Sequence, residues 1–328
     1  MTCEVAIVVA VLAFAFGFAA QRGSVCGVLA ARQIVETGRY SRLKAFISAS
    51  ICALAVAVPL AWIFPDHFIL SQSFSGVTIA MLGGGVYGLG TVINGACVFG
   101  TASRALSGNL SFVAALPGIA GGTVFATIMQ FAHLQVVSSA SPMQKPSFAG
   151  GVLVVAAVLL AGWSLYDLTR SGVRAKIGVQ ELLRASRWRT SIAMFVMGIL
   201  GGALFTGGNA WAYPSLMRQL GHAVAGLPWN LPLVTVVGPI ALLAGGLVSV
   251  RLGGRFAMRR FEPFQMARSL SGGATMGMAS TLVPGGNDVM LLADLPSLGL
   301  HAAVAYPAML ATQIGLLYGV RTWRFRRP

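Results

Sequence analysis

Two cysteines, Cys26 and Cys97, lie in sequence surroundings that suit thiol chemistry. The first ends the run RGSVC at residues 22–26, and the second ends the run NGAC at residues 94–97. In both runs, glycine and small or polar residues come first and helix-forming residues follow, which is typical of the start of a short helix. Backbone N–H groups without partners and the positive end of the helix dipole gather at such a start. A thiol there is activated and anions are attracted, so both cysteines are candidate functional residues.

The other two cysteines, Cys3 and Cys52, lie in plain apolar runs, where a thiol serves as a small apolar side chain. The sequence has no CxxC pair, and no histidine stands at metal-ligand spacing from a cysteine. We therefore expect no metal site, no disulfide framework and no cofactor.

The run LVPGGND at residues 282–288 brings two glycines and two polar residues together after an apolar stretch. Ionisable side chains in a membrane are costly and often functional. Asp288 is therefore either a proton-coupling group or the cap of a helix start at the outer surface, and we favour the cap. Asp294 is expected to be a solvated loop residue, and none of the four histidines, His301 included, has a visible ligand partner.

The composition indicates that membrane helices must position these residues. Of the 328 residues, 56% are hydrophobic and only 9% are charged, whereas soluble domains carry roughly 25% charged residues. The net charge of +15 comes from Lys and Arg in short segments between apolar runs, which indicates orientation in a lipid bilayer rather than nucleic-acid binding. The first apolar run follows Glu4 without a preceding Lys or Arg, so we expect an uncleaved span rather than a signal peptide.

The apolar runs predict an all-α polytopic membrane protein with about nine transmembrane helices, since a span needs about 20 apolar residues. Four further stretches begin with glycine and are too short or too broken to be simple spans. They are re-entrant half-helices around one central site, or loops lying flat in the interface. The predicted spans are 2–21, 43–64, 76–95, 110–132, 148–169, 190–206, 228–250, 269–284 and 298–320. The predicted half-helices are 23–36, 95–108, 207–220 and 285–295.

The basic residues predict the orientation of the chain. When successive connections between the spans are assigned to alternate sides of the membrane, all Lys and Arg residues fall on one side except Lys145 and Arg218. The positive-inside rule puts the crowded side in the cytoplasm. We therefore expect an inner-membrane protein with its N-terminus outside and its C-terminus in the cytoplasm.

Small-residue patterns recur in two halves of the chain at offsets of 189 and 185 residues. Cys97 then lies opposite Gly286, and Cys26 lies opposite Trp211. Five spans separate equivalent elements, and an odd number inverts the second half, as in many transporters. The aligned segments are 83–91 with 272–280, and 17–26 with 202–211. The predicted pseudo-repeats are about 1–135 and about 190–320, linked by the fifth span and a basic cytoplasmic loop over 148–189.

The sequence resembles the YeeE/YedE family of sulfur-compound transporters over essentially its whole length. The resemblance rests on GACVFG at 95–100, its most specific part, on RGSVCG at 22–27, on the spacing between them, and on LVPGGND at 282–288. It implies a permease that takes up a small sulfur-containing anion, such as thiosulfate, along a central path. A small cytoplasmic sulfur carrier of the TusA type is the implied partner. The expected path residues are Cys97, Cys26, Gly95, Gly100, Gly285, Gly286, Asn287 and Asp288.

The sequence departs from the family in one respect. Characterised members use a third cysteine in the second half, and here no cysteine lies beyond Cys97. The safer expectation is thus a sulfur-containing anion, of which thiosulfate is one. The alternatives are a permease or channel for an unrelated small solute, a purely structural membrane subunit, and an intramembrane sulfurtransferase with Cys97 as nucleophile. The last needs an activating base, and no His or Lys lies near Cys97 in sequence, so we expect a transporter rather than an enzyme.

Overall fold

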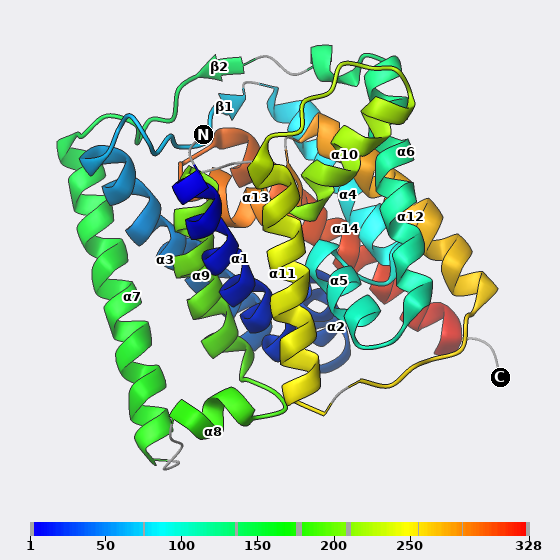
Figure 1. The fold of residues 1–328 in the computed structure, drawn as a ribbon, viewed down its shortest axis with the longest axis horizontal. Coiled ribbons are helices and arrows are strands. Elements are labelled where there is room, and N and C mark those ends of the chain that lie inside the picture. Colours follow the sequence, from blue (N-terminus) through cyan, green and yellow to red (C-terminus); the bar gives the residue numbers. More distant parts are fainter. Residues whose placement is uncertain are drawn as a thin grey trace.

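A computed structural model describes residues 3–74, 76–134, 137–174, 179–207, 211–254, 256–283 and 285–325. It is a bundle of helices in which α1 starts at the upper face and α14 ends at the lower face (Figure 1). The long helices are α1 (Cys3–Gly23), α3 (Ser41–Ile63), α4 (Val77–Asn94), α6 (Ala115–Ile128), α7 (Phe148–Arg174), α9 (Thr190–Gly207), α11 (Leu233–Leu252), α12 (Pro263–Leu282) and α14 (Leu300–Phe325). The short ones are α2 (Gly27–Thr37), α5 (Val98–Leu106), α8 (Val179–Arg184), α10 (Tyr213–Val224) and α13 (Asn287–Val289), with the 3₁₀ helices η1 (Leu110–Ala114) and η2 (Phe131–Leu134) and the π-helical turn η3 (Met290–Asp294).

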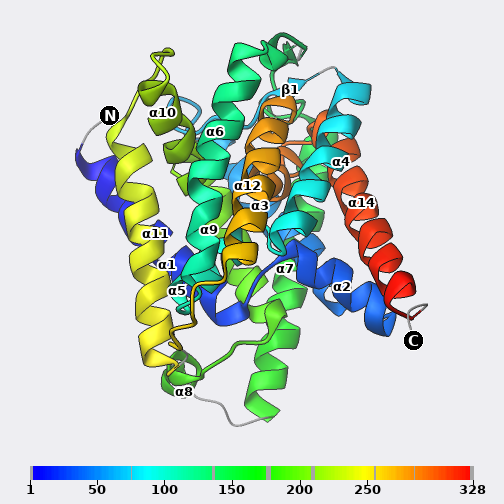
Figure 2. The same ribbon diagram turned by 90° about the vertical axis from the view of Figure 1, so that its right-hand side faces the viewer.

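Eight of the nine predicted spans are confirmed as long apolar helices. In the part of the chain that the structure describes, eight helical stretches have the length and apolarity to cross a membrane. The protein is therefore a multi-pass membrane protein. The remaining predicted span, 269–284, corresponds to α12, a 20-residue helix that is less apolar and begins earlier, at Pro263. Helix α12 lies between α4 and α6 (Figure 2), and its buried face includes Gly272, Gly273 and Gly277.

Short helices occur at all four positions predicted for half-helices. They are α2, α5, α10, and α13 continued by η3. Residues 208–210, where the third of these was expected to begin, lie outside the described residues. The fold is all-helical apart from one short antiparallel pair, which β1 (Ser73–Phe74) forms with β2 (Val137–Ser139). This pair joins two connections at the upper face (Figure 1).

Glycines allow the long helices to cross with their backbones in contact. A Cβ atom added to Gly84 would lie 2.2 Å from the Ala305 carbonyl oxygen, where α4 crosses α14. A Cβ atom added to Gly273 would lie 2.4 Å from the Ala115 carbonyl oxygen, where α12 crosses α6. Any larger residue at either glycine would push the helices apart. Two further close crossings join α1 to α11 and α3 to α9.

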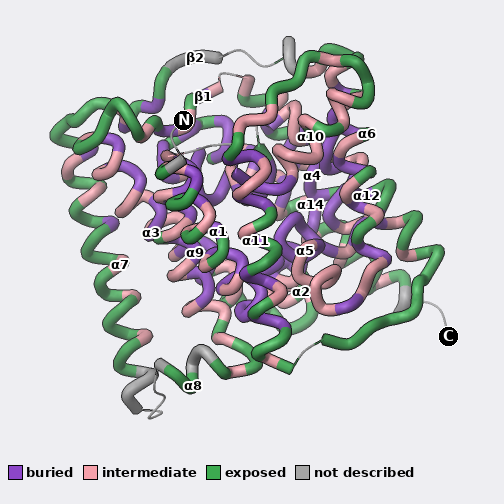
Figure 3. Tube along the Cα trace, in the orientation of Figure 1, coloured by how far each residue is buried: buried purple, intermediate pink, exposed green. Residues whose placement is uncertain are grey.

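The buried residues lie mainly in the interior of the bundle, on long and short helices alike, whereas α7 lies at its edge (Figure 3). Many apolar side chains of α7 are exposed, including Trp163 at 71% and Leu159 at 68%. An apolar surface of this kind is suited to lipid contact.

Candidate functional site

Cys26 and Cys97 each immediately precede a short helix, as predicted. Cys26 is the N-cap residue of α2 and Cys97 is the N-cap residue of α5, both with extended backbone. The chain reaches Cys97 through Gly95, which ends α4 in the left-handed conformation at φ +79°. Glycine adopts this conformation without steric cost, which explains its place between two helices that follow each other closely.

The two cysteines meet in the protein interior, although 70 residues separate Gly27 from Cys97. The backbone N–H of Gly27 donates a hydrogen bond to Cys97 Sγ at 3.2 Å. The two thiols interact with each other through their side chains. Cys26 is 2% exposed and Cys97 is 0% exposed. The sequence prediction that these two thiols lie close together therefore agrees with the geometry.

Gly100 lies against the Cys26 thiol. A Cβ atom added to Gly100 would lie 2.6 Å from Cys26 Sγ, which is closer than van der Waals contact. The backbone N–H groups of Leu29 and Cys97 face Cys26 Sγ, and those of Gly27 and Gly100 face Cys97 Sγ. Each sulfur is thus placed among amide donors from both helices.

The chain after α12 reaches the same place from the second half. Gly285 and Gly286 have φ values of +99° and +145° and lead into α13, in which Asn287 is 0% exposed. A Cβ atom added to Gly27 would lie 3.7 Å from Asn287 Nδ2, so the start of α13 lies beside the start of α2. A Cβ atom added to Gly286 would lie 2.9 Å from the Tyr87 hydroxyl, and only glycine fits that position.

The fourth short helix also contacts this centre. The hydroxyl of Tyr213, the first residue of α10, donates a hydrogen bond to the Val98 carbonyl oxygen of α5 at 2.7 Å. Trp211, the residue aligned with Cys26, is 0% exposed and packs its ring against Phe16 and Phe205. Helices α2, α5, α10 and α13 therefore begin around one buried region.

Sequence reasoning missed two polar residues of this region, Gln313 and Tyr87. Gln313 is 0% exposed within α14, and its Nε2 donates to Thr91 Oγ1 at 2.9 Å. Tyr87 is 2% exposed within α4. An amide in the apolar run of the last span was the available signal for Gln313, since buried polar groups in a membrane need partners. Tyr87 gave no comparable signal.

Two expectations about acidic residues are wrong. Asp288 is not at the outer surface, because the turn at the two glycines directs α13 into the protein and leaves this residue 1% exposed. Asp294 is not a solvated loop residue, because η3 holds it 1% exposed. Ser71 Oγ donates a hydrogen bond to Asp294 Oδ1, and His301 Nε2 lies 3.3 Å from Asp294 Oδ2. His301 therefore has an acidic partner that the sequence did not reveal.

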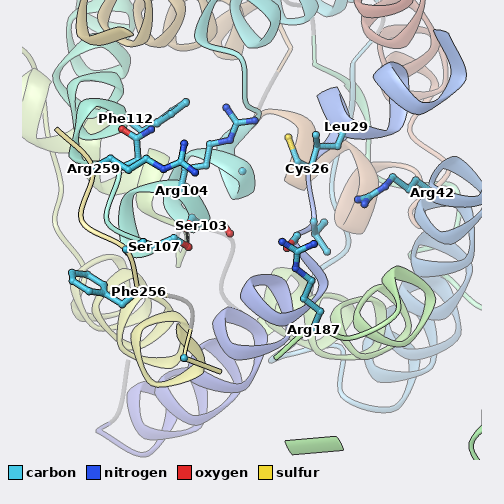
Figure 4. Close-up of a pocket in the computed structure, with 16 residues that line it drawn as sticks. Cys26, Leu29, Arg42, Ser103, Arg104, Ser107, Phe112, Arg187, Phe256 and Arg259 are labelled. Atoms are coloured by element: carbon cyan, nitrogen blue, oxygen red, sulfur yellow. Dashed lines mark hydrogen bonds between the residues drawn. The ribbon is translucent and has the colours of Figure 1, made fainter. Parts of the chain in front are cut away.

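A cavity of about 770 Å³ opens next to Cys26. Figure 4 shows the Cys26 sulfur at its wall, with arginine side chains from several elements around it. Arg104 comes from α5 itself, and its guanidinium lies 4.8 Å from the centre of the Phe112 ring. Hydroxyl groups of Ser103 and Ser107 add polar surface. The arginines that line the cavity are Arg42, Arg104, Arg187 and Arg259.

The cavity lies at the lower face of the bundle (Figure 1). Its lining residues include residues from the start of α3, from the connection before α9 and from the connection between α11 and α12. Such a cavity attracts anions, because several fixed cations converge on one concave surface. Cys26 lines this cavity, whereas the buried Cys97 is not one of the residues that line it.

Cys52 lies away from this region, in the packed crossing of α3 and α9. It is 1% exposed, and a Cβ atom added to Gly198 would lie 2.8 Å from Cys52 Cβ. The prediction that Cys52 is a packing residue agrees with this position. The side chain of Cys3 lies outside the described residues.

A family model described as sulphur transport matches residues 22–314, which include both cysteines, α13 and Gln313. A search of curated proteins found no match. Because the family match spans most of the sequence, the chain belongs to the sulphur-transport family, also called YeeE/YedE.

Proposed function

We propose that this protein takes up a small sulfur-containing anion, with thiosulfate as the first candidate, across the bacterial inner membrane. The observation that carries the proposal is the contact of two buried thiols, Cys26 and Cys97, beside a cavity lined by four arginines. The family match supports transport of a sulfur compound. The substrate would pass Cys97 and then Cys26 on its way to the arginine-lined cavity.

The chemistry of the two thiols suits an anion with a terminal sulfur. Full dehydration of an anion in hydrocarbon is prohibitive, and backbone N–H groups replace lost water without adding a fixed cation. The starts of α2 and α5 provide such groups around both sulfurs. A thiol adds a weak S–H donor and a polarizable surface. Passage requires no covalent step, so we propose a transporter rather than an enzyme.

The remaining predicted path residues have roles that follow from their geometry. Gly95 and Gly100 allow α4, α5 and the Cys26 thiol to approach one another. Gly285 and Gly286 allow the chain to turn into the centre from the second half. Asn287 and Asp288 would then form the wall of the path opposite Cys97.

The helix crossings support two inverted repeats over about 1–135 and about 190–320. Gly84 lies against Ala305, and Gly273 lies against Ala115. Gly273 follows Gly84 by 189 residues and Ala305 follows Ala115 by 190 residues, so the repeat maps one crossing onto the other. The second value differs by one residue from the offset that aligns 83–91 with 272–280. In Figure 1, α4 descends whereas α12 ascends, and α6 ascends whereas α14 descends. We propose that the four short helices are re-entrant elements of these repeats and that α12 is the ninth span.

The basic lower face supports a cytoplasmic orientation for this side, with the N-terminus outside and the C-terminus inside. On this orientation the arginine-lined cavity is the cytoplasmic exit. We propose that a small sulfur carrier of the TusA type receives the sulfur compound at this face.

Growth with thiosulfate as the sole sulfur source tests the proposed function. A bacterial strain that lacks sulfur-anion uptake should grow when it expresses the wild-type chain and should fail to grow with Cys97→Ala at equal membrane expression. Equal growth of both strains would point instead to a permease for an unrelated solute, with incidental cysteines. If neither strain grows, the protein is a structural subunit or transports a different substrate.

A further inference from the structure

We propose that Asn287 and Gln313 hold the oxygen atoms of the transported anion while its sulfur lies against the Cys97 thiol. This assignment rests on the proposed function and deepens it, because it defines the substrate as a sulfur anion that also carries oxygen. It makes the two amides specificity-determining residues of the central site.

The first observation is that both side chains are buried with unused hydrogen-bonding atoms. Asn287 and Gln313 are each 0% exposed. Within the described part of the chain, neither Asn287 Nδ2 nor Asn287 Oδ1 has a hydrogen-bond partner, and Gln313 Oε1 has none. A buried donor without a partner is costly and is retained where a bound acceptor satisfies it, so Asn287 Nδ2 is the atom that points to an anion. The two amide oxygens are acceptors, and a proton donor such as water would satisfy them rather than the anion.

The second observation is that both amides converge on one residue next to the thiol. A Cβ atom added to Gly27 would lie 3.7 Å from Asn287 Nδ2 and 4.0 Å from Gln313 Nε2. The N–H of this same Gly27 donates to Cys97 Sγ at 3.2 Å. Two amide nitrogens and one sulfur from three different helices therefore surround the glycine that starts α2.

The third observation concerns the orientation of Gln313. Its Nε2 donates one hydrogen to Thr91 Oγ1 at 2.9 Å. An amide nitrogen carries two hydrogens, so one remains for another acceptor. Asn287 Nδ2 provides two more, which gives the site neutral N–H donors suited to anion oxygens.

This arrangement separates anions by chemistry. A site with buried donors rejects an analogue that lacks the matching acceptors, because its polar groups are then left unpaired. A thiol surface on one side and amide donors on the other favour an anion with a sulfur end and an oxygen end. An anion with a soft sulfur but no oxygen, such as thiocyanate, should bind less well.

The nearby carboxylate makes the charge of residue 287 important. Asp288 Oδ1 would lie 3.3 Å from a Cβ atom added to Gly286, so a carboxylate already adjoins this wall. Asn287→Asp keeps the shape of the side chain but replaces the donor with a charged acceptor. This variant should repel an anion that the wild-type side chain binds.

The test is uptake of ³⁵S-thiosulfate by vesicles that contain the full-length purified protein. We expect Asn287→Ala and Gln313→Ala each to raise KM by roughly ten-fold or more, because a lost hydrogen bond to a charged group has about this effect. Asn287→Asp should abolish uptake. Excess thiocyanate should compete poorly in wild type and should compete relatively better in Asn287→Ala. Asn230→Ala, at an exposed position, is the matched control and should behave as wild type.

Each outcome bears on the proposal. Wild-type KM and wild-type competitor ranking in both alanine variants would overturn the assignment while leaving thiosulfate uptake intact. A wild-type protein that takes up no thiosulfate would overturn the proposed function and this assignment together. Unfolding temperatures measured on the same preparations detect folding defects, and the isosteric Asn287→Asp keeps the test decisive if an alanine variant does not fold. Active uptake by a folded Asn287→Asp protein would contradict the proposal.

Discussion

The backbone N–H of Gly27 donates a hydrogen bond to the sulfur of Cys97 at 3.2 Å, deep inside the helical bundle. The bond joins the start of α2 to the residue before α5, and the Cys26 and Cys97 thiols interact beside it. A thiol at one short helix is thus held by the backbone of the other. We therefore propose that the two cysteines act as one site, and changes at either helix start should affect the same step.

Replacement of the other cysteines should distinguish a cysteine on the transport path from one that only packs between helices. We expect Cys26→Ala to impair uptake of ³⁵S-thiosulfate, because this thiol lies between Cys97 and the cavity. Cys52→Ala should leave uptake near normal at equal expression, because Cys52 packs at the crossing of α3 and α9. Equal uptake by the two variants would argue against a path along Cys26.

Gly100→Ala should reduce uptake strongly. Its new methyl group would lie 2.6 Å from Cys26 Sγ and would displace that thiol. The matched control is Gly121→Ala on α6, since a Cβ atom added there meets nothing within 4 Å. Uptake assays on both variants in the same membranes check this prediction. A wild-type rate for Gly100→Ala would mean that the position of the Cys26 thiol does not matter.

Arg104→Gln should weaken uptake by removing a cation from the cavity next to Cys26. We expect a several-fold loss at low salt and a smaller loss at high salt, because ions screen exposed charges. Arg104→Lys should retain part of the rate, whereas Arg170→Gln at the exposed end of α7 should have no effect. Uptake measured across a series of salt concentrations gives the comparison. A loss that does not vary with salt would contradict an electrostatic role.

The orientation can be tested with single cysteines introduced at exposed positions. Glu181→Cys in α8 should react with a membrane-impermeant thiol reagent only after the cytoplasmic side is opened. Asp66→Cys in the connection after α3 should react from outside in intact cells. The background should carry Cys3→Ser, and the same background without an introduced cysteine measures any reaction of the buried native thiols Cys26, Cys52 and Cys97. Reaction of position 181 from outside would contradict the proposed topology.

The sequence predicted most of the elements because their signals are local. Apolar length identified eight spans, and glycine-led runs identified the four short helices. Asp294 was misread because polar residues near glycine and proline are typical of a solvated loop, whereas here η3 buries the carboxylate against Ser71 and His301. The roles of buried Gln313 and Tyr87 depend on which helix face meets the centre. Tertiary packing determines which face that is, and the sequence of a single apolar run does not indicate it.

The most direct test of a path along Cys97 is the rate of ³⁵S-thiosulfate uptake by vesicles that contain equal amounts of folded wild-type protein or Cys97→Ala. We predict saturable uptake by the wild-type protein and uptake at the level of empty vesicles for the variant. We also predict that thiosulfate slows labelling of Cys97 by a small thiol reagent in the wild-type protein. Saturable uptake by Cys97→Ala at the wild-type rate would contradict a path along this thiol.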